Sequence, residues 1–156
     1  MLDHIPLPAF ASFDGPKSAK VMLLGEAWGE SEAMTRKPFV GESGKELFRM
    51  IAEVWPSDSW AETESTLHYG SAWIGPRKAV LSELEICMTH VLSLRPLANS
   101  LDSVACKKAE LPKEYSWPSI PSKTRGLYLR PEFLSELSRL KVEIEEVRPN
   151  LIIALG

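Results

Sequence analysis

The chain has 156 residues, of which 44% are hydrophobic and 25% charged, and its formal net charge is −3. This length favours one domain with a substantial core, and the charge excludes a globally basic protein, so any nucleic-acid site has to rest on a local patch. No segment approaches the roughly 20 apolar residues of a membrane helix, and residues 1–8 fit no secretory signal, so we expect a cytoplasmic protein without membrane contact.

The first part of the chain predicts a strand, a loop and a helix. The apolar run of residues 20–25 ends in glycine, as a buried parallel strand does. A polar, glycine-containing stretch follows. Ser43 and Glu46 have the spacing of a capping box, and Pro56 ends the helix that they start. The apolar residues of this helix recur at helical spacing: Leu47, Phe48, Ile51, Val54 and Trp55.

The middle of the chain is less regular. Residues 57–75 predict a long connection, residues 77–84 a helix, and residues 86–92 a second buried strand, with Cys87 as a reduced core thiol. Residues 97–126 form a loop of a length that is usually functional or disordered. Two interpretations of it stay open. Its basic residues contact phosphate groups or are merely solvated, and Tyr115 and Trp117 stack on a planar ligand or anchor the loop. The basic residues are Lys107, Lys108, Lys113, Lys123 and Arg125.

The last unit gives the clearest pattern. Pro131 suits the first turn of a helix, Pro149 ends that helix, and residues 151–155 predict a strand. One helix face is apolar, with Phe133, Leu137, Leu140, Ile144 and Val147. The alternation of strands and helices predicts a single α/β domain over residues 1–156, a layered sandwich with a central, mainly parallel sheet flanked by helices. Because a buried strand needs flanking structure, we expect further chain after Gly156, or a partner in its place.

Four short segments carry the chemical motifs. Residues 25–32 are Gly-Glu-Ala-Trp-Gly-Glu-Ser-Glu and residues 36–44 are Arg-Lys-Pro-Phe-Val-Gly-Glu-Ser-Gly. Residues 89–99 are Thr-His-Val-Leu-Ser-Leu-Arg-Pro-Leu-Ala-Asn, and residues 148–156 are Arg-Pro-Asn-Leu-Ile-Ile-Ala-Leu-Gly. In this order they resemble the motifs of the uracil-DNA glycosylase superfamily, and most of all its family-four branch. The resemblance implies a base-excision repair protein that hydrolyses the N-glycosidic bond of a flipped-out uracil in single- or double-stranded DNA.

The resemblance also assigns the site. A carboxylate beside the sugar stabilises the oxocarbenium-like state in which the glycosidic bond breaks, and Glu26 takes this catalytic role. Phe39 offers an aromatic face to the extruded base, a contact worth ~1–3 kcal/mol, and the backbone at Ala27 and Trp28 meets charge on the departing base. His90 stands where the family has an Asn that reads uracil; the plainer alternative is a core histidine. The expected DNA-backbone contacts are Gly41, Ser43, Gly44, Arg95 and Asn99.

Three departures from the family shape the expectations. The chain has two cysteines, and Leu94 stands at one of the four positions that hold an iron–sulfur cluster, so we expect no cofactor and no metal. A neutral imidazole offers one donor and one acceptor that point apart, so His90 reads uracil less securely than Asn does. The late His-Pro-Ser motif is missing, and losing one such contact costs ~10²–10³ in rate.

Three functions remain open at this stage. The first is a glycosylase completed by further chain. The second is a catalytically silent module that binds DNA or a protein partner through the same fold. The third is a nucleotide-binding domain, which is disfavoured because the loop is neither G-x-G-x-x-G nor a Walker loop and because Glu26, Glu30 and Glu32 would repel a phosphate.

Overall fold

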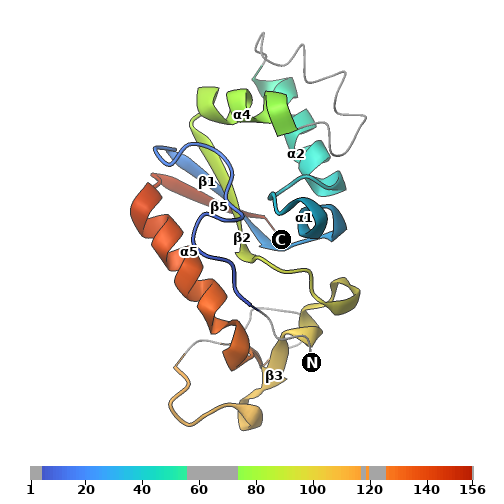
Figure 1. Ribbon diagram of the computed structural model, residues 1–156, viewed down its shortest axis with the longest axis vertical. Helices are drawn as coiled ribbons and strands as arrows, with labels where there is room; N and C mark the ends of the chain where they lie inside the picture. Colours follow the sequence, from blue (N-terminus) through green and yellow to red (C-terminus); the bar gives the residue numbers. More distant parts are fainter. Residues whose placement is uncertain (1–4, 56–73, 117–118, 120–125, 156) are drawn as a thin grey trace.

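The fold is known from a computed structural model that describes residues 5–55, 74–116, 119 and 126–155. Figure 1 shows a central sheet between helices, with a smaller two-stranded sheet at one end of the molecule. The main elements are β1 (Val21–Ala27), α1 (Glu30–Thr35), α2 (Glu42–Val54), α4 (Ile74–Glu83), β2 (Ile86–Leu92), α5 (Leu134–Val147) and β5 (Leu151–Leu155). The shorter ones are β3 (Ala105–Lys107), β4 (Leu127–Leu129), and the 3-10 helices Leu97–Asn99, Leu101–Ser103, Lys108–Glu110 and Pro131–Phe133.

The central sheet has the order β2-β1-β5, and both pairs of neighbouring strands are parallel. The predicted α/β fold with a mainly parallel sheet is therefore confirmed. The register places Gly25 of β1 opposite His90 on one side and Leu155 on the other. Because the strands are parallel, their carboxyl ends meet at one edge of the sheet, where ligands of open α/β sheets bind.

Helices cover both faces of the sheet (Figure 1), and each face has its own core. On one face, α2 and α4 cover the strands, and their shared cluster is Leu23, Phe39, Phe48, Val80, Leu81 and Met88. On the other face, α5 and the segment before β1 form the cluster Phe13, Ala19, Met22, Cys87 and Val147. Cys87 is a buried free thiol in this second cluster, as predicted.

The start of α2 differs from the prediction. The helix begins at Glu42 after Gly41, and Gly41 makes no side-chain cap hydrogen bond, so the expected capping box of Ser43 and Glu46 is wrong. Instead, a carboxylate oxygen of Glu32 accepts hydrogen bonds from the N–H groups of Val40 and Gly41. A tertiary contact thus takes over the role of a local cap, which is why sequence spacing did not reveal it.

The end of α2 also differs. The side chains of Val54 and Trp55 are 81% and 59% exposed, so the apolar stripe expected over residues 47–55 is buried only in its first turns. The helix α1 was not predicted at all, because Glu32 is its one buried residue and no apolar period marks it.

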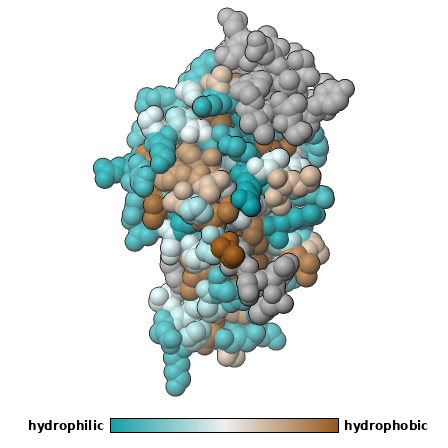
Figure 2. Space-filling model, in the orientation of Figure 1, coloured by the Kyte–Doolittle hydropathy of each residue, from teal (hydrophilic) through white to brown (hydrophobic). Residues whose placement is uncertain are grey.

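The strand β5 lies where the prediction put it. It pairs with β1 along one edge, and no other strand of the described ranges pairs with it. Leu151, Ile152 and Ile153 are 52%, 41% and 38% exposed, so the described residues do not supply the flanking structure that this strand was expected to need. Apolar atoms reach the surface across the middle of the molecule, and hydrophilic side chains line much of its periphery (Figure 2).

The described part of the loop after residue 97 contains short strands and turns of 3-10 helix. The strands β3 and β4 pair antiparallel, and the Tyr115 hydroxyl donates a hydrogen bond to the Leu129 carbonyl oxygen at 2.8 Å. The Tyr115 and Tyr128 rings also meet edge to face. Tyr115 is therefore an anchor of the loop. Trp117, Lys123, Arg125 and most of the connection at residues 57–75 lie outside the described residues. None of the described helices has the length and apolarity to cross a bilayer.

Candidate functional site

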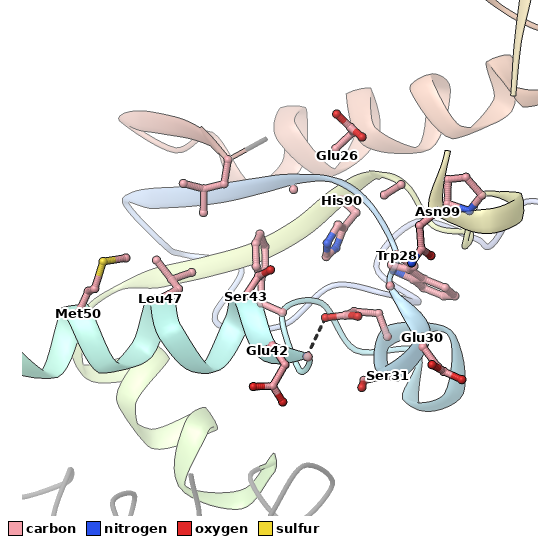
Figure 3. A pocket seen from close by; sticks show the side chains of 18 residues that line it. Glu26, Trp28, Glu30, Ser31, Glu42, Ser43, Leu47, Met50, His90 and Asn99 are labelled. Carbon is pink, nitrogen blue, oxygen red and sulfur yellow. Dashed lines mark hydrogen bonds between the residues drawn. The ribbon is translucent and has the colours of Figure 1, made fainter. Parts of the chain in front are cut away.

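A pocket of about 700 Å³ opens at the carboxyl ends of β1 and β2, beside α1 and the start of α2 (Figure 3). This volume is typical of small-molecule sites. The lining residues are Gly25, Glu26, Ala27, Trp28, Gly29, Glu30, Ser31, Glu32, Phe39, Gly41, Glu42, Ser43, Leu47, Met50, His90, Pro96, Asn99 and Leu155. Of the ten site residues predicted from sequence, eight line this pocket, and Gly44 and Arg95 do not.

The innermost feature of the pocket is a pair of stacked rings. The His90 imidazole lies on the Phe39 ring with 4.7 Å between ring centroids and 27° between planes. Gly25 makes this possible, because a Cβ at that position would lie 2.4 Å from His90 Cδ2 and 3.0 Å from Phe39 Cζ. His90 and Phe39 are only 5% and 6% exposed. The strand register and one glycine thus bring the two predicted base-binding rings together.

His90 is uncharged at neutral pH. Burial lowers its pKa to about 4, and Arg139 and Arg77 act in the same direction, while Glu32 opposes them. The Nδ1 atom of His90 is buried and has no hydrogen-bond partner within the described part of the chain. The ring therefore carries an unused polar atom in the pocket wall.

The backbone at Phe39 is left-handed, with a φ of 53°. Such a conformation costs a non-glycine residue of order 1–3 kcal/mol unless the surroundings impose it. Glu32 imposes it from one side, since its Oε1 accepts the Val40 N–H at 3.0 Å and the Gly41 N–H at 2.9 Å. Figure 3 shows the second of these bonds as a dashed line. The sequence analysis treated Glu32 only as one of three acidic residues and missed this structural role.

Arg77 of α4 holds the left-handed backbone of Phe39 in place from the other side. Its side chain is fully buried, and it donates to the carbonyl oxygens of Phe39, at 2.8 Å, and of Pro38. Its Nε lies 2.8 Å from a carboxylate oxygen of Asp14. Burial lowers the pKa of Arg77 from its usual value, and Asp14 opposes that shift. Sequence reasoning saw Arg77 only as the start of a helix, because its partners are distant in the chain.

A buried charged cluster on α5 fixes the end of β2. Arg139 donates to the His90 carbonyl oxygen at 2.5 Å and to the Val91 carbonyl oxygen at 3.1 Å, and it forms ion pairs with Glu136 and Glu143. The two carboxylates in turn accept hydrogen bonds from Ser93 N–H and from the Thr89 hydroxyl.

Three buried charged side chains thus lie on α5 next to the stripe that the sequence predicted to be apolar, beside the buried Leu140 and Val147. Their spacing, residues 136, 139 and 143, is the signal that would have found them, since it places all three on one helix face.

The predicted catalytic residue Glu26 is exposed, and its carboxylate leaves β1 on the side opposite His90 (Figure 3). Successive side chains of a strand alternate between faces, so Gly25 and Ala27 face the stacked rings whereas Glu26 points to the α5 side of the sheet edge. Other carboxylates line the pocket. Glu30 lies 3.6 Å from Arg95, and Glu42 lies 2.6 Å from Lys45. The pocket is therefore acidic.

The remaining predicted residues range from buried to exposed around the pocket. Trp28 is buried, and its backbone N–H donates to the Leu94 carbonyl oxygen at 3.0 Å, so this N–H is not available to a departing base. Ser43 is exposed at the pocket. Gly44 is buried beneath Phe39, where a Cβ would lie 2.0 Å from the Phe39 oxygen. Arg95 stands outside the pocket and donates to Asn99 Oδ1 at 3.0 Å, which orients Asn99 at the rim.

The residues present do not fit an iron–sulfur cluster, which needs four cysteine thiolates. The sequence has two cysteines, and these lie on different strands, Cys87 on β2 and Cys106 on β3. Among the described residues, no group of three or more His, Cys, Asp or Glu side chains is arranged to hold a metal ion.

Comparisons with known proteins agree with this geometry. Residues 13–156 match the family model of the uracil DNA glycosylase superfamily. A curated relative named Type-4 uracil-DNA glycosylase, from Saccharolobus solfataricus, is 29% identical over 143 residues. The aligned part covers 92% of this chain and 43% of the relative, so the chain spans less than half of that relative's length.

Proposed function

The chain belongs to the uracil DNA glycosylase superfamily, and on this basis we propose that it takes a uracil flipped out of DNA into the pocket and hydrolyses its N-glycosidic bond. The observation that carries the proposal is the convergence of Ala27, Phe39 and His90 on one pocket at the sheet's carboxyl edge. Extrusion of a base into a closed site is how enzymes reach atoms that the duplex hides. The proposed partner is uracil-containing DNA, single- or double-stranded.

The charge of the pocket supports glycosidic chemistry over phosphate binding. Four glutamates line it: Glu26, Glu30, Glu32 and Glu42. A sugar that develops oxocarbenium character is stabilised by nearby carboxylates, whereas a phosphate at the same place is repelled. A nucleotide-binding function therefore has little support. We propose that DNA phosphates bind outside the pocket, where Arg95 beside Asn99 is the contact.

We propose Glu26 as the carboxylate on the sugar side of the pocket. It immediately precedes Ala27, is exposed, and has no ion pair to another described residue. A carboxylate in that position can turn toward a sugar held at the rim, outside the stacked rings. Glu32 lies closer to the rings, but its carboxylate holds the backbone of Val40 and Gly41, so we assign it a structural role.

The test compares base release by the wild type and by two isosteric variants. Oligonucleotides containing one uracil, single- and double-stranded, are incubated with the protein and then cleaved with alkali at abasic sites. We expect Glu26→Gln to lose at least 100-fold in rate and Glu145→Gln, an exposed control on α5, to keep the wild-type rate. Cleavage by wild type that does not exceed the Glu26→Gln level rejects the enzyme claim. Full activity of Glu26→Gln together with an inactive, folded Glu32→Gln transfers the role to Glu32.

A second candidate function is a silent DNA-binding module on the same fold. It is favoured by the orientation of Glu26 away from the rings and by the filled space on Phe39. It predicts DNA binding that weakens steeply with salt, because phosphate contacts release counterions, and it predicts no base release. Efficient release of uracil by the wild type excludes it.

A further inference from the structure

We infer that His90 closes the base slot: its imidazole takes the place on Phe39 that a pyrimidine would occupy, so a base enters only when that ring moves away. The inference rests on the proposed base-binding function of the pocket. The ring geometry is the first observation. A centroid separation of 4.7 Å and an interplanar angle of 27° are those of a stacked pair, and an extruded base would make the same contact with Phe39.

The second observation is that Phe39 has no other free face. Its side chain is 6% exposed. Its remaining surface belongs to the core cluster with Leu23, Phe48, Val80, Leu81 and Met88. A base therefore cannot stack on Phe39 beside the imidazole, and one planar ring has to replace the other.

The third observation is how the imidazole is held. The backbone of His90 is fixed by Arg139, which donates to its carbonyl oxygen, and by the ladder with β1. The side chain itself stacks on the Phe39 ring and packs closely over Gly25, which has no Cβ to obstruct it. Its Nδ1 has no hydrogen-bond partner in the described part of the chain. Rotation of the ring out of the slot thus breaks no hydrogen bond at Nδ1, and the strand that carries it stays in place.

This arrangement makes His90 a specificity-determining residue rather than a reader of the base edge in the closed state. A ligand has to be a planar heteroaromatic ring that stacks on Phe39 well enough to displace the imidazole. Removing the imidazole leaves a slot between Gly25 and Phe39 that is already shaped for such a ring. The chemical class that fits is a pyrimidine base, and free uracil is the probe.

The experiment measures binding of free uracil by isothermal titration calorimetry to the wild type, His90→Ala and His90→Phe. We expect His90→Ala to bind uracil at least tenfold more tightly than the wild type. His90→Phe, the matched control that keeps a ring on Phe39, should not gain affinity. Equal affinities for the wild type and His90→Ala overturn the inference, and so does a gain in His90→Phe equal to that in His90→Ala.

A second measurement does not depend on a variant that folds. In the wild type, the imidazole protons of His90 should show ring-current shifts from Phe39 in NMR spectra. These shifts should disappear when a uracil-containing oligonucleotide is bound, and their persistence in the complex overturns the inference. The proposed glycosylase function can fail separately. If His90→Ala binds uracil more tightly but no form of the protein releases a base from DNA, the inference about the base slot is supported and the proposed glycosylase activity is rejected.

Discussion

Replacing Arg77 by Met tests how the base slot is supported. The guanidinium is fully buried, and its bonds join Asp14, Pro38 and Phe39 to α4. Met has a similar length but no donors, so the variant leaves the Asp14 carboxylate, whose side chain is 12% exposed, without its buried cation. Removing one partner of a buried ion pair costs about 3–5 kcal/mol. Since a domain is stable by about 5–15 kcal/mol in total, the loss is a large fraction of the stability.

The assay is urea unfolding followed by circular dichroism at pH 7.5. The expected result is a fall in the free energy of unfolding of about 3–5 kcal/mol for Arg77→Met. The matched control is Arg49→Met on α2, because Arg49 also contacts two carboxylates, Glu46 and Glu53, but in solvent. It should leave the urea midpoint almost unchanged.

A double variant identifies the source of the cost. Asp14→Asn combined with Arg77→Met removes the stranded charge as well, and it should recover part of the lost stability, because replacing both partners of a buried pair is often close to neutral. An Arg77→Met loss below about 1 kcal/mol would refute the argument that this buried pair holds the Phe39 segment in place.

Two further predictions concern buried titratable groups. Because burial lowers the pKa of His90 to about 4, the unfolded chain binds a proton below pH 6.5 that the folded chain does not, so stability should fall by up to about 1.4 kcal/mol per pH unit between pH 6.5 and 4. Urea midpoints of His90→Asn should lack this slope, and equal slopes would contradict the assignment. Burial also raises the pKa of Cys87 to about 12, so in a Cys106→Ser background a thiol reagent at pH 8 should label Cys87 only after unfolding; rapid labelling of the native protein would disprove this.

The sequence predicted the regular elements well where an apolar period was present. The strands at residues 86–92 and 151–155 and the helix before Pro149 lie where expected. The order β2-β1-β5 could not be read, because parallel crossovers leave no local signal of which strands become neighbours.

The motif located the pocket but not what supports it. Residues 25–43 and His90 do meet, because the glycines and the strand register are local features. Glu32, Arg77 and Arg139 escaped notice because their bonds reach backbone groups 8 to 49 residues away. The orientation of Glu26 was readable in principle. The sequence analysis ended the first strand at Gly25 and so missed this orientation. Because the strand continues to Ala27, the alternation of side chains puts Glu26 on the face opposite to Gly25 and Ala27.

The order in which the pocket is assembled has a consequence for biosynthesis. Gly25 pairs with Leu155, which lines the pocket, and Arg139 fixes the backbone of His90, so the parts of the site are synthesised far apart in time. At about 5–20 residues per second, several seconds separate translation of His90 from that of Leu155. During that interval the β1 edge and its apolar side chains have no partner strand. We expect the emerging polypeptide to depend on ribosome-associated chaperones then, and to become competent for ligand only when α5 and β5 have docked.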